Sequence, residues 1–185
     1  MRTSVTATAA ILAMALAHPA AATTLQQISD GFADGVSICL EATLKNAAIA
    51  DLPADIRARV APAGENARFM VAARNPNGPI WDVLSAKDHI VVSEAAKGDC
   101  EVITYGPPVQ ATIDEAMAAV KSHSPAFTAS DDQPDDYTPI RAGLSATVDG
   151  AHIHAVFEGV EPGTVPARKF RFSLIQARFI RTSGQ

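Results

Sequence analysis

Residues 98–106 read Gly-Asp-Cys-Glu-Val-Ile-Thr-Tyr-Gly. The β-branched and aromatic residues between the two glycines predict a buried strand at 100–105. This strand carries Cys100, one of only two cysteines in the chain, and the other, Cys39, lies nearer the amino terminus. A bond between the two cysteines would join two segments that are far apart in the sequence.

Residues 1–22 have the three parts of a secretory signal peptide. Arg2 gives a positive amino end, residues 9–17 are apolar, and Ala20 and Ala22 are spaced for cleavage. The apolar run is shorter than the roughly 20 residues that cross a bilayer as a helix. We therefore expect cleavage after Ala22 and a bacterial protein that is periplasmic or secreted, with no stable membrane insertion afterwards.

Length, charge and cysteine content limit the possible classes of protein. Residues 23–185 are enough for a single α+β domain with its own apolar core. The formal net charge of -5 argues against nucleic acid as a partner, because that would need a clustered basic face. Two cysteines in an exported chain most simply pair with each other, so we predict a disulfide between Cys39 and Cys100.

A long helix is predicted at the start of the mature chain. Thr24 and Gln27 have the spacing of a capping box, which places the helix start there. The following apolar residues recur every three or four positions and form one stripe over about 22 residues. They are Ile28, Phe32, Val36, Cys39, Leu40, Leu44 and Ala47. Gly31 and Gly35 on this helix either allow close approach of another element or only lower helix stability.

Strands and a second main helix follow. A short helix near 53–60 precedes four predicted strands with short connections, which implies an antiparallel meander. A second capping box at 112–115 predicts a helix that ends near His123. After an exposed acidic loop, two strands flank Asp149-Gly150, a strong hairpin signal, and a final strand follows. The strands are expected at 68–73, 80–85, 89–94, 100–105, 140–148, 151–160 and 169–181, and the loop at 130–136.

The final strand has an alternation of apolar residues that changes phase near its middle. This pattern predicts either a bulge or a strand covered on both faces. Together the elements predict an α+β fold: an antiparallel sheet of about seven strands with the two main helices packed on one face.

Candidate binding residues lie on the strands. His152 and His154 point to one face and could supply two zinc ligands, but no third ligand is placed near them, and a solvent-facing role is the alternative. Arg171 and Arg178 could hold an anionic group, or could simply keep the final strand soluble. Trp81, the only tryptophan, fills the core or stacks on a ligand.

The motifs of several enzyme classes are absent from the sequence. It contains no Gly-x-Ser-x-Gly, no His-Glu-x-x-His, no glycine-rich phosphate loop and no Cys-x-x-Cys. We therefore expect no cofactor. The favoured hypothesis is a non-catalytic binding module of the cell envelope, for a small apolar molecule, an envelope component or a protein. The alternative is a hydrolase or metal-dependent enzyme that uses His152, His154 and carboxylates.

The first half of the mature chain resembles a group of small exported bacterial proteins of unknown function. These proteins have a helix with a phenylalanine and a Cys-Leu pair, a strand with tryptophan, and a strand of the form Gly-x-Cys-x-Val. The matching residues, within 24–120, are Phe32, Cys39, Leu40, Trp81, Gly98, Cys100, Val102 and Gly106. The resemblance implies an exported α+β domain with one disulfide, and it implies no activity.

Overall fold

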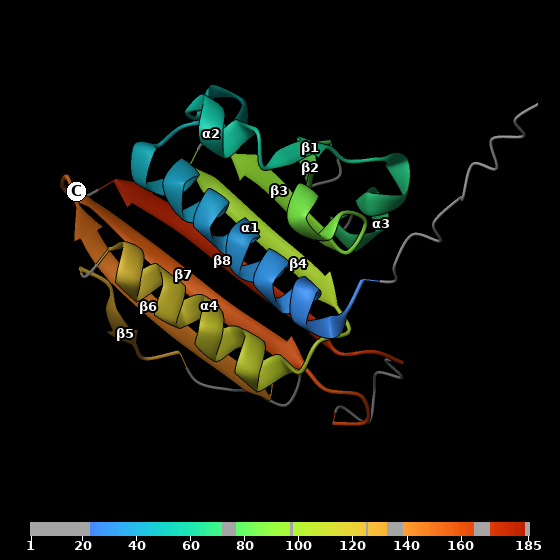
Figure 1. Ribbon diagram of the computed structural model, residues 1–185. Helices are drawn as coiled ribbons and strands as arrows, with labels where there is room; N and C mark the ends of the chain where they lie inside the picture. The colour runs from blue at the N-terminus through green and yellow to red at the C-terminus, as the bar shows by residue number, and fades with distance from the viewer. Residues whose placement is uncertain are drawn as a thin grey trace, which may run out of the picture.

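A computed structural model describes residues 23–71, 77–96, 98–124, 126–132, 139–164 and 171–183. The predicted signal peptide, residues 1–22, lies outside the described residues. The described chain forms one antiparallel sheet of eight strands, with two long helices side by side on one face (Figure 1). The α+β prediction is therefore confirmed, with eight strands where about seven were expected. None of the described helices is long and apolar enough to cross a membrane.

The sheet consists of two meanders that meet in its centre. Each meander has four strands, and they join where β4 pairs with β8, with Val102 opposite Ala177. Both edges of the sheet are strands of three residues. From edge to edge the order is β1 (Val60–Pro62), β2 (Ile80–Val83), β3 (Ile90–Ala96), β4 (Asp99–Tyr105), β8 (Leu174–Ser183), β7 (Ala151–Val160), β6 (Ile140–Val148) and β5 (Thr128–Ser130).

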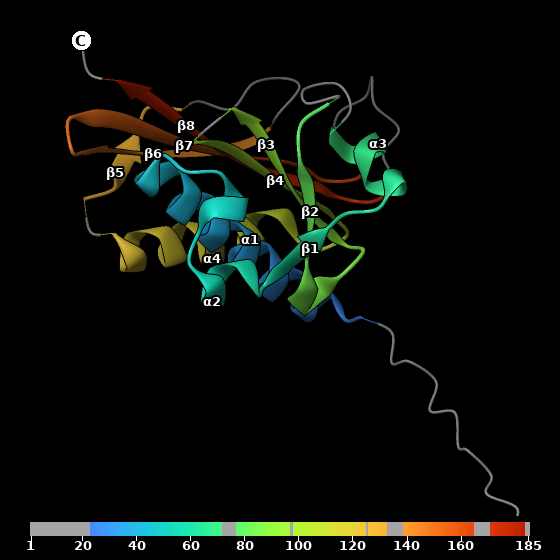
Figure 2. The same ribbon diagram turned by 90° about the horizontal axis from the view of Figure 1, so that it is seen from above.

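The first predicted strand, 68–73, is wrong. Residues Arg68–Val71 form the helical turn α3, and the strand of that region is β1, which the pattern missed. The helical turn brings Val71 into a small apolar cluster with Ile80, Val91 and Ile103, on the sheet face opposite the long helices (Figure 2). Burial of that side chain outweighs the β propensity of the segment.

Other short elements adjust the remaining boundaries of the first meander. The chain leaves β2 at Val83 and continues as the 3-10 turn η3 (Leu84–Ala86), so the predicted strand 80–85 is too long. A short helix, α2 (Ala54–Arg57), lies within the predicted 53–60, preceded by the turn η1 (Ile49–Asp51). A further turn, η2 (Glu65–Ala67), leads into α3.

The first long helix, α1 (Leu25–Lys45), begins at the predicted capping box. The hydroxyl of Thr24 accepts from the backbone N–H of Gln27 at 3.2 Å, and the side chain of Gln27 accepts from the backbone N–H of Thr24 at 2.8 Å. The predicted stripe is buried against the sheet, with Phe32 and Val36 fully inaccessible to solvent.

Two glycines let α1 approach strand β4 and the turn η3 closely. A Cβ atom on Gly35 would lie 2.8 Å from a methyl group of Val102, and one on Gly31 would lie 2.5 Å from the Cβ of Ala86. Real Cβ atoms do not approach other atoms so closely. These glycines therefore allow the close approach of another element, rather than only lowering helix stability.

The second long helix, α4 (Val109–His123), starts earlier than its predicted capping box. Glu161 accepts a hydrogen bond from the backbone N–H of Val109 at 2.8 Å, so a carboxylate from the far half of the chain caps the helix. The hydroxyl of Thr112, expected at the cap, instead hydrogen-bonds to that of Ser29 in α1 at 2.8 Å, in a buried contact between the two helices. The predicted end at His123 is confirmed.

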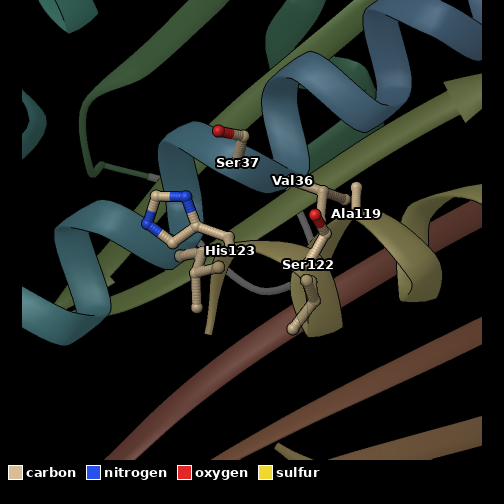
Figure 3. A pocket seen from close by; sticks show the side chains of 7 residues that line it. Val36, Ser37, Ala119, Ser122 and His123 are labelled. Atoms are coloured by element: carbon tan, nitrogen blue, oxygen red, sulfur yellow. The ribbon is translucent and has the colours of Figure 1, made fainter. Parts of the chain in front are cut away.

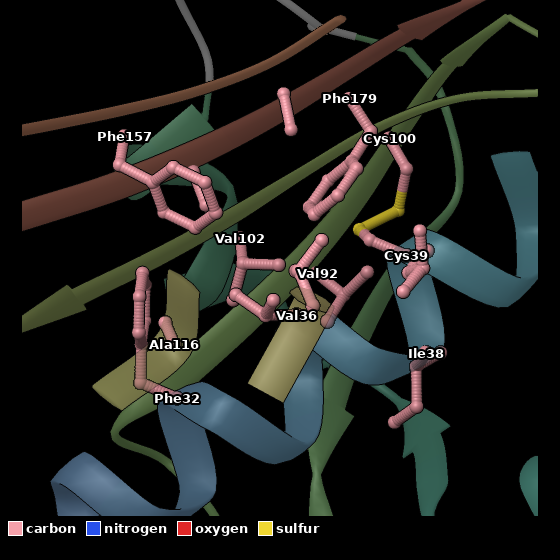
Figure 4. Close-up of a cluster of buried hydrophobic side chains, with 14 of the residues drawn as sticks. Phe32, Val36, Ile38, Cys39, Val92, Cys100, Val102, Ala116, Phe157 and Phe179 are labelled. Carbon is pink, nitrogen blue, oxygen red and sulfur yellow. A yellow bond between two sulfur atoms is a disulfide. The ribbon is translucent and has the colours of Figure 1, made fainter. Parts of the chain in front are cut away.

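The disulfide between Cys39 and Cys100 is present and joins α1 to β4 (Figure 4). Both cysteines are buried, and Cys100 lies opposite Phe179 in the sheet. Phe179 in turn packs edge-to-face on Phe157, with ring centroids 6.2 Å apart. The bond therefore closes one side of the apolar cluster between the helices and the sheet.

The second meander follows the sequence pattern closely. The bounds of β6 and β7 are those predicted, and Asp149 and Gly150 both have positive φ, as a tight hairpin turn requires. The start predicted for the last strand, 169, is wrong because β8 begins at Leu174, and residues 165–170 lie outside the described part. Its pairing with β7 continues without a register shift, and its middle is buried on both faces, which explains the change of phase.

Candidate functional site

The candidate residues predicted from the sequence do not all lie on the same face of the sheet. We call the face away from α1 and α4 the outer face; His154 and Arg178 lie on it, in the same alternation as Ile103. His152 is on the same face and exposed, while Trp81 belongs to the helix-covered face. Arg171 is exposed in the segment before β8. Three of the five candidates, His152, His154 and Arg178, therefore lie on the outer face.

Charged side chains form a continuous network on the outer face. Glu158 is only 8% exposed and accepts from Arg141 at 3.3 Å, from Arg178 at 3.4 Å and from Gln176 at 3.2 Å. Arg141 also lies 3.6 Å from Asp132. Buried charge is tolerated when it is paired in this way. Arg178, a predicted anion ligand, therefore binds a carboxylate of the protein itself.

Asp132 lies at one end of this network, although the sequence predicted a solvated loop there. Its carboxylate accepts from Ser130 at 2.5 Å and lies 2.8 Å from Nε2 of His154. A Cβ on Gly143, beneath it in β6, would overlap the carboxylate, so only glycine leaves room. Burial raises the pKa of Asp132, but hydrogen bonds from Ser130 and His154 and the charge of Arg141 outweigh burial and hold that pKa below its usual value. Asp132 does lie in a loop, but its predicted exposure to solvent is wrong.

A catalytic triad of hydrolases consists of a serine, a histidine and a carboxylate. The same three residue types meet here in Ser130, His154 and Asp132, but they do not have the geometry of such a triad. In a triad the histidine bonds to the serine with one ring nitrogen and to the carboxylate with the other. Here Ser130 and Asp132 both contact Nε2 of His154, and the serine hydroxyl donates directly to the carboxylate. Within the described residues no three His, Cys, Asp or Glu side chains are grouped so that they could hold a metal ion.

Trp81 of β2 is linked to the turn η1 through Glu94 of β3. Its indole N–H donates to Glu94 at 2.8 Å, and the other oxygen of Glu94 accepts from the backbone N–H of Ile49 at 2.7 Å. The ring packs on the main apolar cluster and lines a small hollow of about 230 Å³ together with Arg57. Its indole therefore has a structural partner, and one part of it remains accessible.

A larger hollow lies between the two long helices on their solvent side (Figure 3). The helices run parallel, because Ser29 meets Thr112 near their starts and Glu41 meets His123 near their ends, with 2.7 Å between carboxylate and imidazole. The hollow has a volume of about 380 Å³, and we call it the interhelical groove. It is lined by Val36, Ser37, Leu40, Ala119, Val120, Ser122 and His123.

The interhelical groove combines an apolar floor with a polar rim. Val36, Leu40 and Val120 are almost inaccessible and form the floor, whereas Ser122 and His123 are exposed. The sequence did not reveal this hollow. The only sequence feature that marks this hollow is a run of small residues on α4. Such runs are also common on ordinary solvent-facing helices, so they do not predict a hollow.

Comparison with protein-family models, with curated proteins and with solved structures found no match for this chain. The resemblance to small exported bacterial proteins therefore stays a prediction, and the functional argument depends on the geometry of this molecule.

Proposed function

We propose that this protein is an exported, non-catalytic binding module whose ligand lies in the interhelical groove. The observation that carries the proposal is the groove itself: an apolar floor, a few polar rim groups and a volume of about 380 Å³. Small-molecule sites in proteins have this composition and volumes of about 300–1,000 Å³. The disulfide supports export, because such bonds persist in oxidising compartments.

The walls of the groove favour a small apolar molecule with one hydrogen-bonding group. The floor side chains offer only apolar contacts, while Ser37 and Ser122 offer hydroxyl groups at the rim. At one end the lining residue His123 pairs with Glu41 of α1, which also pairs with Lys45. A bounded hollow of this kind suits a small ligand better than a flat protein partner.

The proposal is tested by filling the groove. Ala119→Trp places an indole in the hollow, and Ala118→Trp places the same side chain on the exposed side of α4, one residue away. The probe is N-phenyl-1-naphthylamine, a neutral apolar dye whose fluorescence rises on burial. We expect saturable binding to the wild type and to Ala118→Trp, and at least about tenfold weaker binding to Ala119→Trp, which corresponds to about 1.4 kcal/mol.

Equal binding by the three proteins, or no saturable binding to the wild type, would overturn the proposal. Melting curves of both variants show whether each retains the fold, so a loss of binding with an intact melting transition is attributable to the groove.

The second candidate is a hydrolase in which Ser130 is the nucleophile, and the proximity of Ser130, His154 and Asp132 favours it. Its test is covalent labelling by a fluorophosphonate, which reacts with activated serines. If the wild type is labelled at Ser130 and the Ser130→Ala variant is not labelled, the hydrolase hypothesis supersedes the binding-module hypothesis. The direct bond between the serine and the carboxylate leads us to expect no labelling.

A further inference from the structure

A separate hollow on the outer face is bounded by η2, α3 and the strands β2 and β3. Its volume is about 590 Å³, larger than that of the interhelical groove, and the two hollows share no residue. It is lined by Gly64, Glu65, Ala67, Met70, Asp82, Asp88 and Val91. Three carboxylates and several apolar side chains therefore face one space.

Asp82 is the unusual member of this set. It is only 5% exposed, yet within the part of the chain that the structure describes, its carboxylate has no hydrogen bond and no ion pair. Burial raises the pKa of Asp82, the nearby charge of Asp88 raises it further, and that of Lys87 opposes them. The oxygens of Asp82 are nevertheless not sealed from solvent, so a ligand in the hollow can reach the carboxylate.

We propose that this hollow is a binding site for an organic cation, an ammonium or guanidinium group carried on a short apolar body. The cation pairs with Asp82, and the carboxylates of Glu65 and Asp88 at the rim attract it. The apolar body lies on Met70 and Val91. The site is independent of the interhelical groove, so this inference does not rest on the function proposed above.

The arrangement of the carboxylates favours an organic cation over a metal ion. Calcium takes six to eight oxygen ligands at about 2.3–2.6 Å, and so needs several carboxylates that converge on one point. Among the described residues no three acidic or other metal-binding side chains converge in this way. An organic cation needs only one close carboxylate, and it also uses the apolar wall that a metal ion would leave without a partner.

The test is a titration of the whole protein with benzylamine, followed by amide NMR shifts. Benzyl alcohol, the neutral analogue of nearly the same shape, is titrated in parallel. Asp82→Asn removes the buried charge with little change in volume, and Asp55→Asn removes an exposed carboxylate on α2 as the matched control. Wild type and Asp55→Asn should bind benzylamine at millimolar concentration, with shifts centred on the residues that line the hollow.

Benzyl alcohol should bind at least about tenfold more weakly, and Asp82→Asn should lose benzylamine affinity by a similar factor. Ala119→Trp should leave benzylamine binding unchanged, which separates this site from the groove. Binding of benzylamine to Asp82→Asn with wild-type affinity would overturn the proposal, as would equal binding of the alcohol or no binding to the wild type. Calcium binding that depends on Asp82 would overturn the choice of an organic cation.

Discussion

Removing the disulfide should lower the stability of this protein strongly, because the bond ties α1 to a central strand of the sheet. It closes a segment in which the two cysteines are 61 residues apart. In the chain-entropy model a closure of this length stabilises the fold by about 4 kcal/mol at 25 °C. For a chain of this size, 1 kcal/mol changes Tm by about 2–4 °C, so the expected loss is about 8–16 °C.

The double variant Cys39→Ala/Cys100→Ala is the appropriate perturbation. Both positions are at most 3% exposed, so alanine avoids burying the hydroxyl groups that serine would introduce. Thermal unfolding followed by circular dichroism measures the loss in oxidising buffer. Wild-type protein whose disulfide has been reduced after unfolding should have the same Tm as the double variant.

Two results would refute this reasoning. The first is a double variant whose Tm lies within about 2 °C of the oxidised wild type, because the entropy term would then be far smaller than calculated. The second is the detection of two reactive thiols after denaturation without a reductant, because the bond would then be absent from the native protein.

Three further changes test other contacts. Gly35→Ala should destabilise the protein by about 1–3 kcal/mol in urea unfolding, because the added methyl group meets Val102; a stabilised variant, as helix propensity alone predicts, would contradict the close approach. The lowered pKa of Asp132 stabilises the fold above the unfolded-state pKa of about 3.9, and this contribution is lost as pH falls through the folded-state value. The stability difference between wild type and Asp132→Asn should therefore shrink in acid, and a constant difference would exclude the expected linkage. Trp81→Phe should cost about 1 kcal/mol in thermal unfolding by removing the hydrogen bond to Glu94, and an unchanged Tm would show that this bond contributes nothing.

The elements that the sequence predicted well are those with local signals. Asp149 and Gly150 define their hairpin by backbone conformation alone, and the capping box at Thr24 lies within four residues of the chain. The elements that it missed depend on distant segments. Helix α4 begins at Val109 because Glu161 caps it from 52 residues away. Strands β1 and β5 have three residues each, which is too short for an alternating pattern to appear.

The candidate sites were harder to predict for the same reason. Each combines residues from separate segments: the groove draws on two helices, and the network of the outer face joins Asp132 to His154 and Arg141. His154 and Arg178 were identified as polar residues on strands, but their partners were not. Asp82 carried no signal at all, because an aspartate next to the only tryptophan gives no indication that it will be buried.

The three-residue edge strands have a consequence for how molecules of this protein meet one another. An open sheet can recruit a strand from a neighbouring molecule wherever its outermost backbone groups are free, and this is a common route to aggregation. Here each edge strand presents only three residues, and the proline at the end of β1, Pro62, has no N–H to donate. The two edge strands therefore offer little backbone for strand addition, which suits a chain that folds in a crowded compartment after the proposed export.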